Sequence, residues 1–274
     1  MSASRLALRA KTAARSLPRA TRARARARVV VVTGGTTGIG EAIARTFHAR
    51  GDYVLVAARG SHPALTGLGR RARYVACDVR RPQEVRAAAE AAAAWRGGID
   101  VFINNAGYSA WRALERVDEA FWDTMLSTNL AGVLYGCQAA AAFLRRGGCV
   151  VNVSSLAGKR GSAGNVAYCA AKFGVNGLTQ ALAKELGPRG IRVNAVCPVY
   201  VETAQLREAL SHPDSPTRGR EVAAYLREFA AIQTALGRLP TAQEVAEAVY
   251  FLASPAASGI SGQCVNVDCG TLPQ

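Results

Sequence analysis

The chain has 274 residues, of which half are hydrophobic and 19% are charged. This composition allows a sizeable core and excludes wholesale disorder. No apolar run approaches the roughly 20 residues of a membrane-spanning helix, so we expect no span of a bilayer. Seven scattered cysteines without a CxxC pair and only three histidines argue against a metal site or a disulfide framework. Free thiols in that number fit a reducing compartment.

The net charge of +15 is distributed unevenly. Residues 1–28 carry nine basic side chains and no acidic one, which leaves +6 on the other 246 residues. The remaining chain is therefore only mildly basic, and it lacks the stripe of aromatic and basic residues that single-stranded nucleic acids require. We expect no nucleic-acid partner for it.

The N-terminal 28 residues are rich in Ala and Arg and contain Ser. Such an acid-free segment resembles an organellar transit peptide. The alternatives are a solvated, disordered extension without address function and an arm that binds anions or nucleic acid. We expect a cytoplasmic protein, or one of an organellar matrix if the segment is a transit peptide.

Short apolar runs alternate with helical segments from Val29 onward. The run VVVV at residues 29–32 is typical of a strand buried on both faces of a parallel sheet. The alternation predicts an α/β fold: a doubly wound parallel sheet in one domain over residues 29–274. The expected strands are Val29–Val32, Tyr53–Ala57, Arg73–Ala76, Val101–Ile103, Cys149–Val153, Ile191–Val196 and Gln263–Val267. The expected helices are Glu41–Arg50, Gln83–Trp95, Phe121–Leu144, Val166–Leu186, Glu221–Ala235 and Ala242–Leu252.

An insertion of about residues 202–239 interrupts this alternation and contains the irregular stretch SHPDSPTRG at residues 211–219. In a doubly wound fold, segments beyond the carboxyl ends of the strands lie over the ligand crevice. We therefore expect this insertion to form a lid over a substrate.

A glycine-rich turn follows the first strand and opens the first helix. Gly34, Gly38 and Gly40 stand in the sequence TGGTTGIG. Glycine allows a tight turn and close approach of a pyrophosphate, and the helix N-terminus attracts phosphate. The second strand ends in Ala-Ala-Arg without the carboxylate that accepts the ribose hydroxyl of NAD. Arg59 suits a ribose phosphate instead, which favours NADP.

Tyr168 and Lys172 stand four residues apart on an expected helix, so both face one side. A free tyrosine has a pKa of about 10, too high for a base at neutral pH. A neighbouring ammonium favours the phenolate and lowers that pKa. The pair is therefore a candidate for proton transfer.

With these residues in place, the chain resembles the short-chain dehydrogenase/reductase family over nearly all of residues 29–270. The order and spacing of the shared segments make the resemblance specific. The matching segments are TGGTTGIG (33–40), CDV (77–79), NNAG (104–107), STNLAGV (127–133), NVSS (152–155), YCAAK (168–172), NAVCP (194–198) and SGQCVNVDCG (261–270).

The resemblance implies a catalytic set. Tyr168 matches the tyrosine that gives a proton to the carbonyl oxygen in reduction and removes it in oxidation. Lys172 matches the lysine that lowers the pKa of that tyrosine and binds the nicotinamide ribose. Ser155, thirteen residues before Tyr168, matches the serine that hydrogen-bonds the substrate oxygen, and Ser154 fits that spacing less well. Asn129 matches the asparagine that holds a water in a proton relay.

The resemblance also implies a Rossmann fold and a cofactor site that holds NADP, with NAD the less favoured cofactor, and no metal. The chain residues that match cofactor-binding positions, together with Arg59, are Gly34, Thr36, Thr37, Gly38, Ile39, Gly40, Asp78, Val79, Asn105, Ala106, Gly107, Tyr168, Lys172, Pro198, Val201 and Thr203. A structural role remains open for Asn104 and Asn105, which could stabilise a turn. Asn129 could likewise be satisfied by backbone within a helix.

Two positions depart from the family pattern. Val199 stands where the family has glycine, which leaves room beside the nicotinamide and allows unusual backbone angles; a β-branched side chain there is expected to narrow the pocket or shift the nicotinamide. Cys269 replaces another glycine and is expected to be a packing variation. The residues expected to line a partly apolar substrate pocket are Tyr108, Trp111, Val199, Leu206 and Leu210.

The function implied is hydride transfer between the nicotinamide and a carbonyl or secondary alcohol, most similar to ketoreductases of 3-oxoacyl and polyketide type. A polyol, sugar or diol dehydrogenase of the same family is the enzymatic alternative. A dinucleotide-binding sensor without turnover, and a nucleic-acid binder acting through the basic tail, are alternatives of other classes. Relatives commonly form homotetramers or homodimers through the two long helices at residues 121–144 and 166–186.

Overall fold

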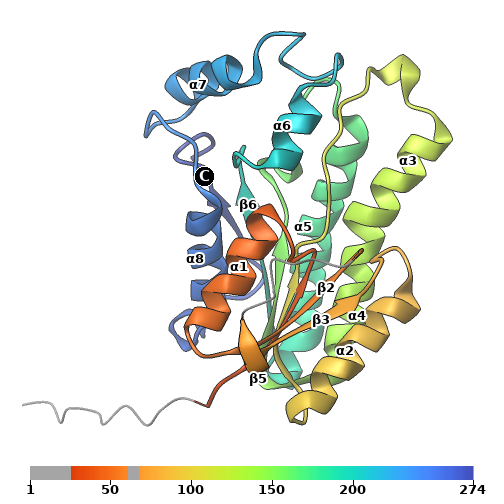
Figure 1. Ribbon diagram of the computed structural model, residues 1–274, viewed down its shortest axis with the longest axis vertical. Helices are drawn as coiled ribbons and strands as arrows, with labels where there is room; N and C mark the ends of the chain where they lie inside the picture. The colour runs from red at the N-terminus through yellow and green to blue at the C-terminus, as the bar shows by residue number, and fades with distance from the viewer. Residues whose placement is uncertain (1–25, 61–67, 274) are drawn as a thin grey trace, which may run out of the picture.

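The structure, a computed structural model, describes residues 26–60 and 68–273. Its centre is a seven-stranded, entirely parallel sheet in the order β3-β2-β1-β4-β5-β6-β7 (Figure 1). The order reverses direction beside β1, so the predicted doubly wound α/β fold is confirmed. The strands are β1 (Val29–Thr33), β2 (Tyr53–Ala58), β3 (Ala72–Ala76), β4 (Ile99–Asn104), β5 (Leu144–Val153), β6 (Arg192–Pro198) and β7 (Cys264–Val267).

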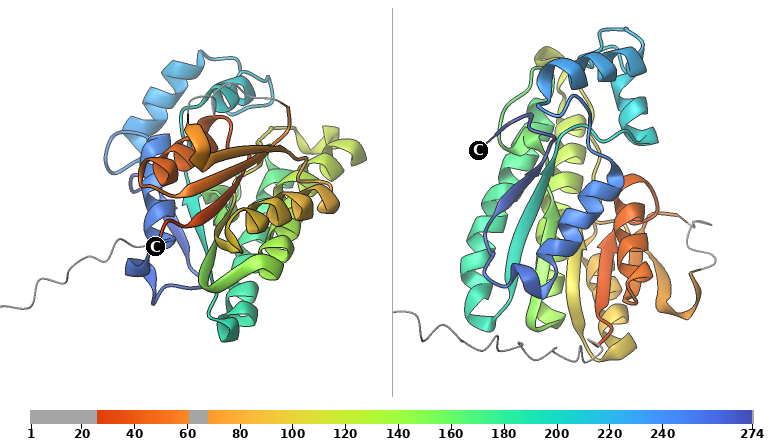
Figure 2. Two further views of the ribbon diagram at one scale, coloured as in Figure 1. Left: turned by 60° about the horizontal axis from the view of Figure 1, so that its bottom comes forward. Right: turned by 90° about the vertical axis from the view of Figure 1, so that its left-hand side faces the viewer.

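Helices cover both faces of the sheet (Figures 1 and 2). One layer contains α1 (Gly38–Ala49) and α8 (Ala242–Leu252), and the other contains α2 (Pro82–Arg96), α4 (Gly132–Phe143) and α5 (Val166–Leu186). The valines of β1 show why this strand is central. Val29 and Val31 pack toward the second layer, whereas Val30 and Val32 pack toward the first, and all four are fully buried. A run of four valines is therefore satisfied only between two helical layers.

The expected long helix at residues 121–144 is divided in the structure. Helix α3 (Glu119–Leu126) begins at Asp118, whose carboxylate accepts a 2.7 Å hydrogen bond from Phe121 N. A π-helical turn at Ser127–Ala131 then separates α3 from α4, and β5 begins at Leu144. The periodicity did not reveal this turn, because a single π-helical turn keeps the chain helical and no residue type marks it in the sequence. The helices expected at Val166–Leu186 and Ala242–Leu252 have the predicted bounds, and the other expected segments are present with shifted ends.

The insertion forms two helices at the end of the sheet where β6 finishes, α6 (Ala204–Leu210) and α7 (Val222–Gln233) (Figures 1 and 2). Helix α6 was not expected from the sequence. The side chains of Trp111, Leu210 and Leu226 make a small core of their own between this layer and the loop after β4. An ion pair between Arg116 and Asp214 joins the same two segments. The insertion is therefore packed against the main domain.

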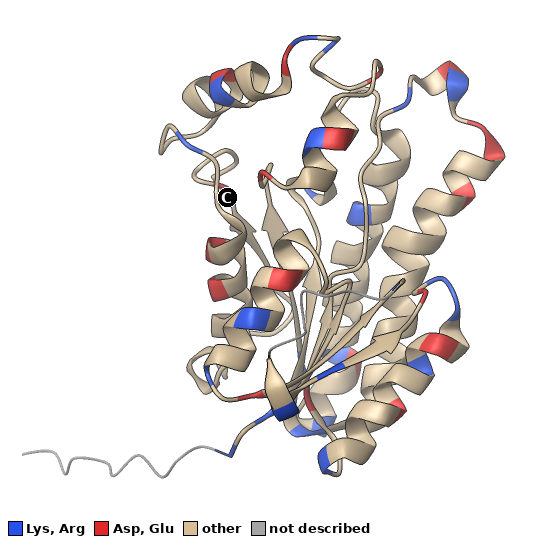
Figure 3. Cartoon of the chain, in the orientation of Figure 1, with Lys and Arg blue, Asp and Glu red and all other residues tan. Residues whose placement is uncertain are grey.

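The first described residues belong to the fold. The Arg28 guanidinium donates to Asp52 at 2.6 Å and lies over the ring of Tyr250, and Arg26 pairs with Asp100. The predictions for residues 1–25, including the transit peptide, lie outside the described residues. Over the described chain, basic and acidic side chains alternate on the helices and loops (Figure 3). No helix there is long and apolar enough to cross a membrane.

Candidate active site

A cavity of about 710 Å³ opens at the carboxyl ends of the strands. Its walls come from the glycine-rich turn, the ends of β2, β4, β5 and β6, helix α5, and the two lid helices. Sixteen of the eighteen residues implied by the family resemblance line it; the two others are Gly38 and Asn129. The structure thus gathers residues from position 34 to position 203 around one cavity. The cavity lies at the carboxyl ends of the strands, where doubly wound folds bind their ligands.

The glycine-rich turn has the shape of a phosphate cradle. Gly34 adopts the left-handed φ of +64°, and its N–H donates to the carbonyl of Ala57 at 2.7 Å. A Cβ on Gly40 would lie 2.2 Å from the Gly34 carbonyl oxygen, so a side chain cannot fit without moving backbone. The first turn of α1 then faces the cavity with its free N–H groups. The free N–H groups and the lack of side chains at this turn fit the pyrophosphate of a dinucleotide.

Two further residues hold the turn against β4. Asn105 Nδ2 donates to the carbonyls of Thr33 and Gly34, each at 3.0 Å. The Thr33 hydroxyl accepts from the N–H of Asn105 and of Ala106 at 3.0 and 3.1 Å. Asn105 therefore has the structural role that the sequence left open. Thr33 was not singled out from the sequence, although a hydroxyl at the end of a strand of valines is the signal that could have found it.

At the far end of this region, Arg59 follows β2 and lines the cavity with an exposed side chain. Asp78 lies beside it and accepts from Arg80 Nε at 3.0 Å. This hydrogen bond to Arg80 holds the pKa of Asp78 at about 2, so the carboxylate is ionised at neutral pH. No carboxylate follows directly on β2 itself. We call the glycine-rich turn, Arg59 and Asp78 the cofactor half of the pocket.

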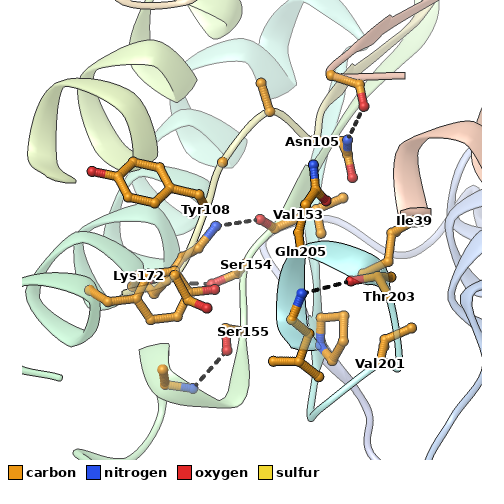
Figure 4. Close-up of a pocket in the computed structure, with 18 of the residues that line it drawn as sticks. Ile39, Asn105, Tyr108, Val153, Ser154, Ser155, Lys172, Val201, Thr203 and Gln205 are labelled. Carbon is orange, nitrogen blue, oxygen red and sulfur yellow. Dashed lines mark hydrogen bonds between the residues drawn. The ribbon is translucent and has the colours of Figure 1, made fainter. Parts of the chain in front are cut away.

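The candidate catalytic residues come from β5 and α5. Lys172 is 4% exposed, and its Nζ donates to the carbonyl of Val153 at 2.9 Å. The same Nζ lies 5.6 Å from the ring centre of Tyr168, one helical turn earlier. Ser155 follows β5, faces the cavity and hydrogen-bonds Tyr168. The Ser154 hydroxyl instead points to the Lys172 carbonyl at 3.4 Å. Figure 4 shows Ser154, Ser155 and Lys172 on one side of the pocket. The contacts thus favour Ser155 over Ser154 as the serine that meets a substrate.

Burial controls the protonation of this group. It raises the pKa of Tyr168 to about 12, although the hydrogen bond from Ser155 acts in the opposite direction. Burial also lowers the pKa of Lys172 to about 8. The sequence predicts that the Lys172 ammonium lowers the pKa of Tyr168, but in this structure desolvation of the phenolate is the larger effect. Tyr168 is therefore protonated at neutral pH, as a proton donor must be.

Asn129 occupies the π-helical turn and is completely buried. Its Oδ1 accepts from the N–H of Tyr108 at 3.1 Å, and its Nδ2 donates to the carbonyl of Met125 at 3.0 Å. Both ends of the amide are thus engaged by backbone, so the side chain fixes the loop after β4. These contacts agree with the alternative role for Asn129, that of a helical residue satisfied by backbone groups.

The other wall of the cofactor half comes from the segment after β6. Thr203 caps α6 by accepting a hydrogen bond from Leu206 N at 3.2 Å. A Cβ on Gly38 would lie 3.1 Å from the Thr203 methyl group, so the two residues are close neighbours. Gln205, not singled out from the sequence, donates to the Thr37 hydroxyl at 3.0 Å. Figure 4 shows Ile39, Val201 and Thr203 across the pocket from Ser155 and Lys172. The start of α6 is thereby fastened to the start of α1.

The two departures from the family pattern differ in their backbone. Val199 lines the cavity and does not adopt a positive φ, so valine causes no left-handed strain there. Cys269 adopts a φ of +52°, a conformation that favours glycine. The expectation of a mere packing variation at Cys269 is therefore wrong, because the position has a backbone requirement.

The remaining walls are large and mostly apolar, and we call them the substrate half. The ring of Tyr200 lies 4.8 Å from that of Phe229 and 6.4 Å from that of Trp111. Tyr108, Val199 and Leu206 line the cavity as expected, but Leu210 does not. It is fully buried in the core between the lid and the loop after β4. The larger side chains of this half are Tyr108, Trp111, Arg160, Val199, Tyr200, Leu206, Pro216, Tyr225 and Phe229, and smaller or polar residues such as Ser109, Ser162 and Asn165 lie among them.

Comparison with known proteins agrees with this geometry. Residues 34–271 match the family model described as enoyl-(acyl carrier protein) reductase. A ketoacyl reductase named for the monensin polyketide synthase of Streptomyces virginiae is 39% identical over 89% of this chain and 97% of its own. A 3-oxoacyl-[acyl-carrier-protein] reductase of Vibrio cholerae is 34% identical over 89% and 96%.

Among solved structures, an actinorhodin polyketide ketoreductase with NADPH aligns with a TM-score of 0.81 at 36% identity, over 89% of this chain and 97% of that one. The ligand-free aldohexose dehydrogenase of Thermoplasma acidophilum aligns with a TM-score of 0.80 at 31% identity, over 91% and 98%. Sequence, fold and pocket therefore agree, and the chain belongs to the short-chain dehydrogenase/reductase family of oxidoreductases.

Proposed function

We propose that this protein is an NADP-dependent ketoreductase that acts on 3-oxoacyl substrates. The observation that carries the proposal is the meeting of Ser155, Tyr168 and Lys172 at the wall of the cavity that also contains the glycine-rich cradle. A nicotinamide cofactor bound there supplies the hydride. The protein supplies orientation and a proton.

Tyr168 gives its hydroxyl proton to the oxygen of the reacting carbonyl. Its pKa of about 12 in the free pocket keeps this proton in place until negative charge develops on the oxygen. Ser155 donates a second hydrogen bond to the same oxygen. The hydrogen bond from Lys172 to the Val153 carbonyl holds the face of α5 that carries Tyr168 against the end of β5. The Lys172 ammonium stabilises the tyrosinate that remains after proton transfer.

The preference for NADP rests on Arg59. A guanidinium can hold a ribose phosphate with paired hydrogen bonds. A carboxylate at the end of β2, which would favour NAD, is lacking in the sequence Ala57-Ala58-Arg59. The similar ketoreductase that was solved with NADPH supports the same cofactor.

The 3-oxoacyl assignment rests on relatives and on the pocket. The relatives named as ketoacyl and 3-oxoacyl reductases are 34% to 39% identical to this chain. An aromatic wall suits an acyl chain or ring better than a polyol, whose hydroxyl groups need hydrogen-bond partners. A sugar dehydrogenase remains the second candidate, because the aldohexose dehydrogenase has almost the same TM-score.

An assembly of identical chains completes the proposal. A groove between α5 and the stretch from α3 to α4 is lined by Leu130, Leu134 and Leu178, and the exposed ring of Phe173 also lies on α5. Apolar surface of this kind favours burial against a second copy, as the family resemblance implies. We expect a dimer or tetramer in light scattering; a monomer would contradict this part.

The bacterial relatives support a cytoplasmic location.

The test is oxidation of NADPH, and separately of NADH, followed by absorbance with a panel of 3-oxoacyl thioesters, cyclic ketones and ketoses. We expect turnover of a thioester or cyclic ketone with NADPH, and a loss of roughly a hundredfold or more in kcat for Tyr168→Phe. Faster turnover of ketoses would favour the sugar dehydrogenase. Binding of NADPH without any turnover would favour a dinucleotide sensor.

A further inference from the structure

The substrate half of the pocket contains a cation that the proposed reaction does not use. Arg160 lines the cavity and is half-buried. Among the described residues of the wall, the other two cations have roles already, since Arg59 belongs to the cofactor half and Lys172 bonds to Val153. The one carboxylate among them, Asp78, lies in the cofactor half and pairs with Arg80.

The turn that holds Arg160 is fixed close to the reacting oxygen. It begins at Ser155, whose hydroxyl accepts from Ala157 N at 3.1 Å, and Arg160 N donates to the Leu156 carbonyl at 3.0 Å. The Gly158 carbonyl accepts from Asn176 of α5 at 2.8 Å. A Cβ on Gly158 would lie 2.6 Å from the Lys172 carbonyl, so the turn packs directly on α5. Arg160 is therefore presented from a rigid support.

The aromatic wall lines the same cavity as this cation. Tyr200 packs on Phe229, with Tyr225 6.2 Å away between ring centres, and the charge of Arg160 acts on the Tyr200 hydroxyl. Among the described residues, no side-chain ion pair engages Arg160. A half-enclosed guanidinium beside aromatic rings attracts a ligand that combines a flat apolar body with negative charge.

We propose that Arg160 binds an anionic group of the substrate, so that this enzyme prefers ketones that carry a carboxylate or a phosphate on an aromatic or cyclic body. The proposal rests on the proposed ketoreductase function for the reaction, but not for the binding. The guanidinium would hold the anion with paired, charge-assisted hydrogen bonds, and the rings would hold the body. Arg160 thus sets which ketone is accepted and takes no part in proton transfer.

Binding can be measured without turnover. The full chain, saturated with NADP⁺, is titrated in a calorimeter with naphthoate, naphthyl phosphate and naphthamide, which share one ring system and differ in charge. We expect naphthoate or naphthyl phosphate to bind roughly tenfold or more tighter than naphthamide. The better of the two anions identifies the group as carboxylate or phosphate. Equal binding of all three probes, or no binding of the anions, would overturn the proposal.

Three variants assign the effect to Arg160. Arg160→Gln should abolish the advantage of the anions and leave naphthamide unchanged, and Arg160→Lys should restore part of it. Lys159→Gln removes the same charge from the neighbouring residue, which does not line the cavity, and should change nothing. An equal loss in both Gln variants would contradict a specific contact and point to the general field of the protein.

Turnover separates this proposal from the ketoreductase proposal. Benzoylpropionate and its methyl ester are reduced by NADPH at the same ketone and differ in one charge. We expect a KM roughly tenfold lower for the acid, and Arg160→Gln should raise that KM with kcat unchanged. Equal KM values for acid and ester would refute the role of Arg160 while the reductase stands. Probe binding that depends on Arg160, without reduction of any ketone, would refute the reductase while the anion site stands.

Discussion

The cofactor half of the pocket is formed mainly by backbone, whereas the substrate half is formed by large side chains. In the cofactor half, Gly34 and Gly40 leave room that a single Cβ would fill. In the substrate half, Tyr200 and Phe229 supply bulk from a segment that follows β6 and from α7. Backbone geometry restricts the choice of residue to glycine, while bulk can be supplied by many residues. The two halves should therefore respond differently to substitution.

The largest effect is expected at Gly40. In Gly40→Ala the new Cβ meets the Gly34 carbonyl at 2.2 Å, so the cradle must open. A displacement of about 1 Å at a positioned group can reduce function roughly a hundredfold, and we expect a loss of that order in NADPH affinity. Gly161→Ala is the matched control, because no atom lies within 4 Å of its Cβ position. Equal affinities in both variants would show that the turn does not depend on this glycine.

Arg59 offers a sharper test of the same half. Arg59→Gln should weaken the binding of NADPH by roughly tenfold or more and leave the binding of NADH unchanged. Only NADPH has the additional ribose phosphate that the guanidinium would bind. The ratio of kcat/KM for the two cofactors measures the effect. Arg70→Gln, an exposed arginine shortly before β3, is the control for charge alone. A parallel loss with NADH would place Arg59 outside the phosphate site.

Lys172 lies between the two halves, and its burial should cost stability. Because its pKa is lowered to about 8 in the folded protein, the charged form is disfavoured by folding below that pH. The free energy of unfolding should therefore rise as pH increases from about 8 toward the unfolded value of about 10.4. Lys172→Met should abolish turnover, raise stability at pH 7 by roughly 1–3 kcal/mol and remove this pH dependence.

Denaturant unfolding at a series of pH values measures both effects of Lys172→Met. Lys184→Met, on the exposed side of the same helix, is the control and should leave the pH dependence as it is in the parent chain. A loss of stability in Lys172→Met would mean that the bond from Nζ to the Val153 carbonyl outweighs the desolvation of the ammonium.

Substitutions in the substrate half should leave the affinity for the cofactor unchanged. Phe229→Ala removes a ring that packs on Tyr200, so we expect the KM for an aromatic ketone to rise about tenfold with the NADPH affinity unchanged. Ile232→Ala, exposed on the same helix α7, is the control. A fall in NADPH affinity in Phe229→Ala would show that the two halves are coupled through the lid.

The same difference explains what the sequence could predict. The glycines of the turn, the four valines of β1 and the pair Tyr168 and Lys172 carry their geometry in residue type and spacing, so the sequence alone predicts them. The wall of Tyr200, Tyr225 and Phe229 was not predicted. Tyr200 lies in the short segment after β6 and the other two lie in the insertion, and no period or motif fixes the backbone in either place. Thr33 and Gln205 were missed for a related reason: a single hydroxyl or amide gives no pattern until its partner is known.

The smallest expected effect concerns the support of the lid. Cys269 adopts a φ of +52°, and its carbonyl accepts from Leu236 N at 3.1 Å just after α7. A residue with a Cβ is disfavoured there by about 1–2 kcal/mol, part of which glycine loses again through its greater freedom in the unfolded chain. We therefore expect Cys269→Gly to raise stability by up to about 1 kcal/mol, which is a few degrees in Tm.

Cys269→Ser separates backbone from chemistry in this test, because serine keeps a Cβ and removes the thiol. If the left-handed φ is the cause, Cys269→Gly raises the Tm and Cys269→Ser does not. If both variants raise it equally, removal of the thiol is the cause and the backbone account of this position is wrong. Since Leu236 connects Cys269 to the end of α7, a gain confined to Cys269→Gly should also lower the KM for ketones slightly, by stiffening the substrate half and leaving the cofactor half as it is.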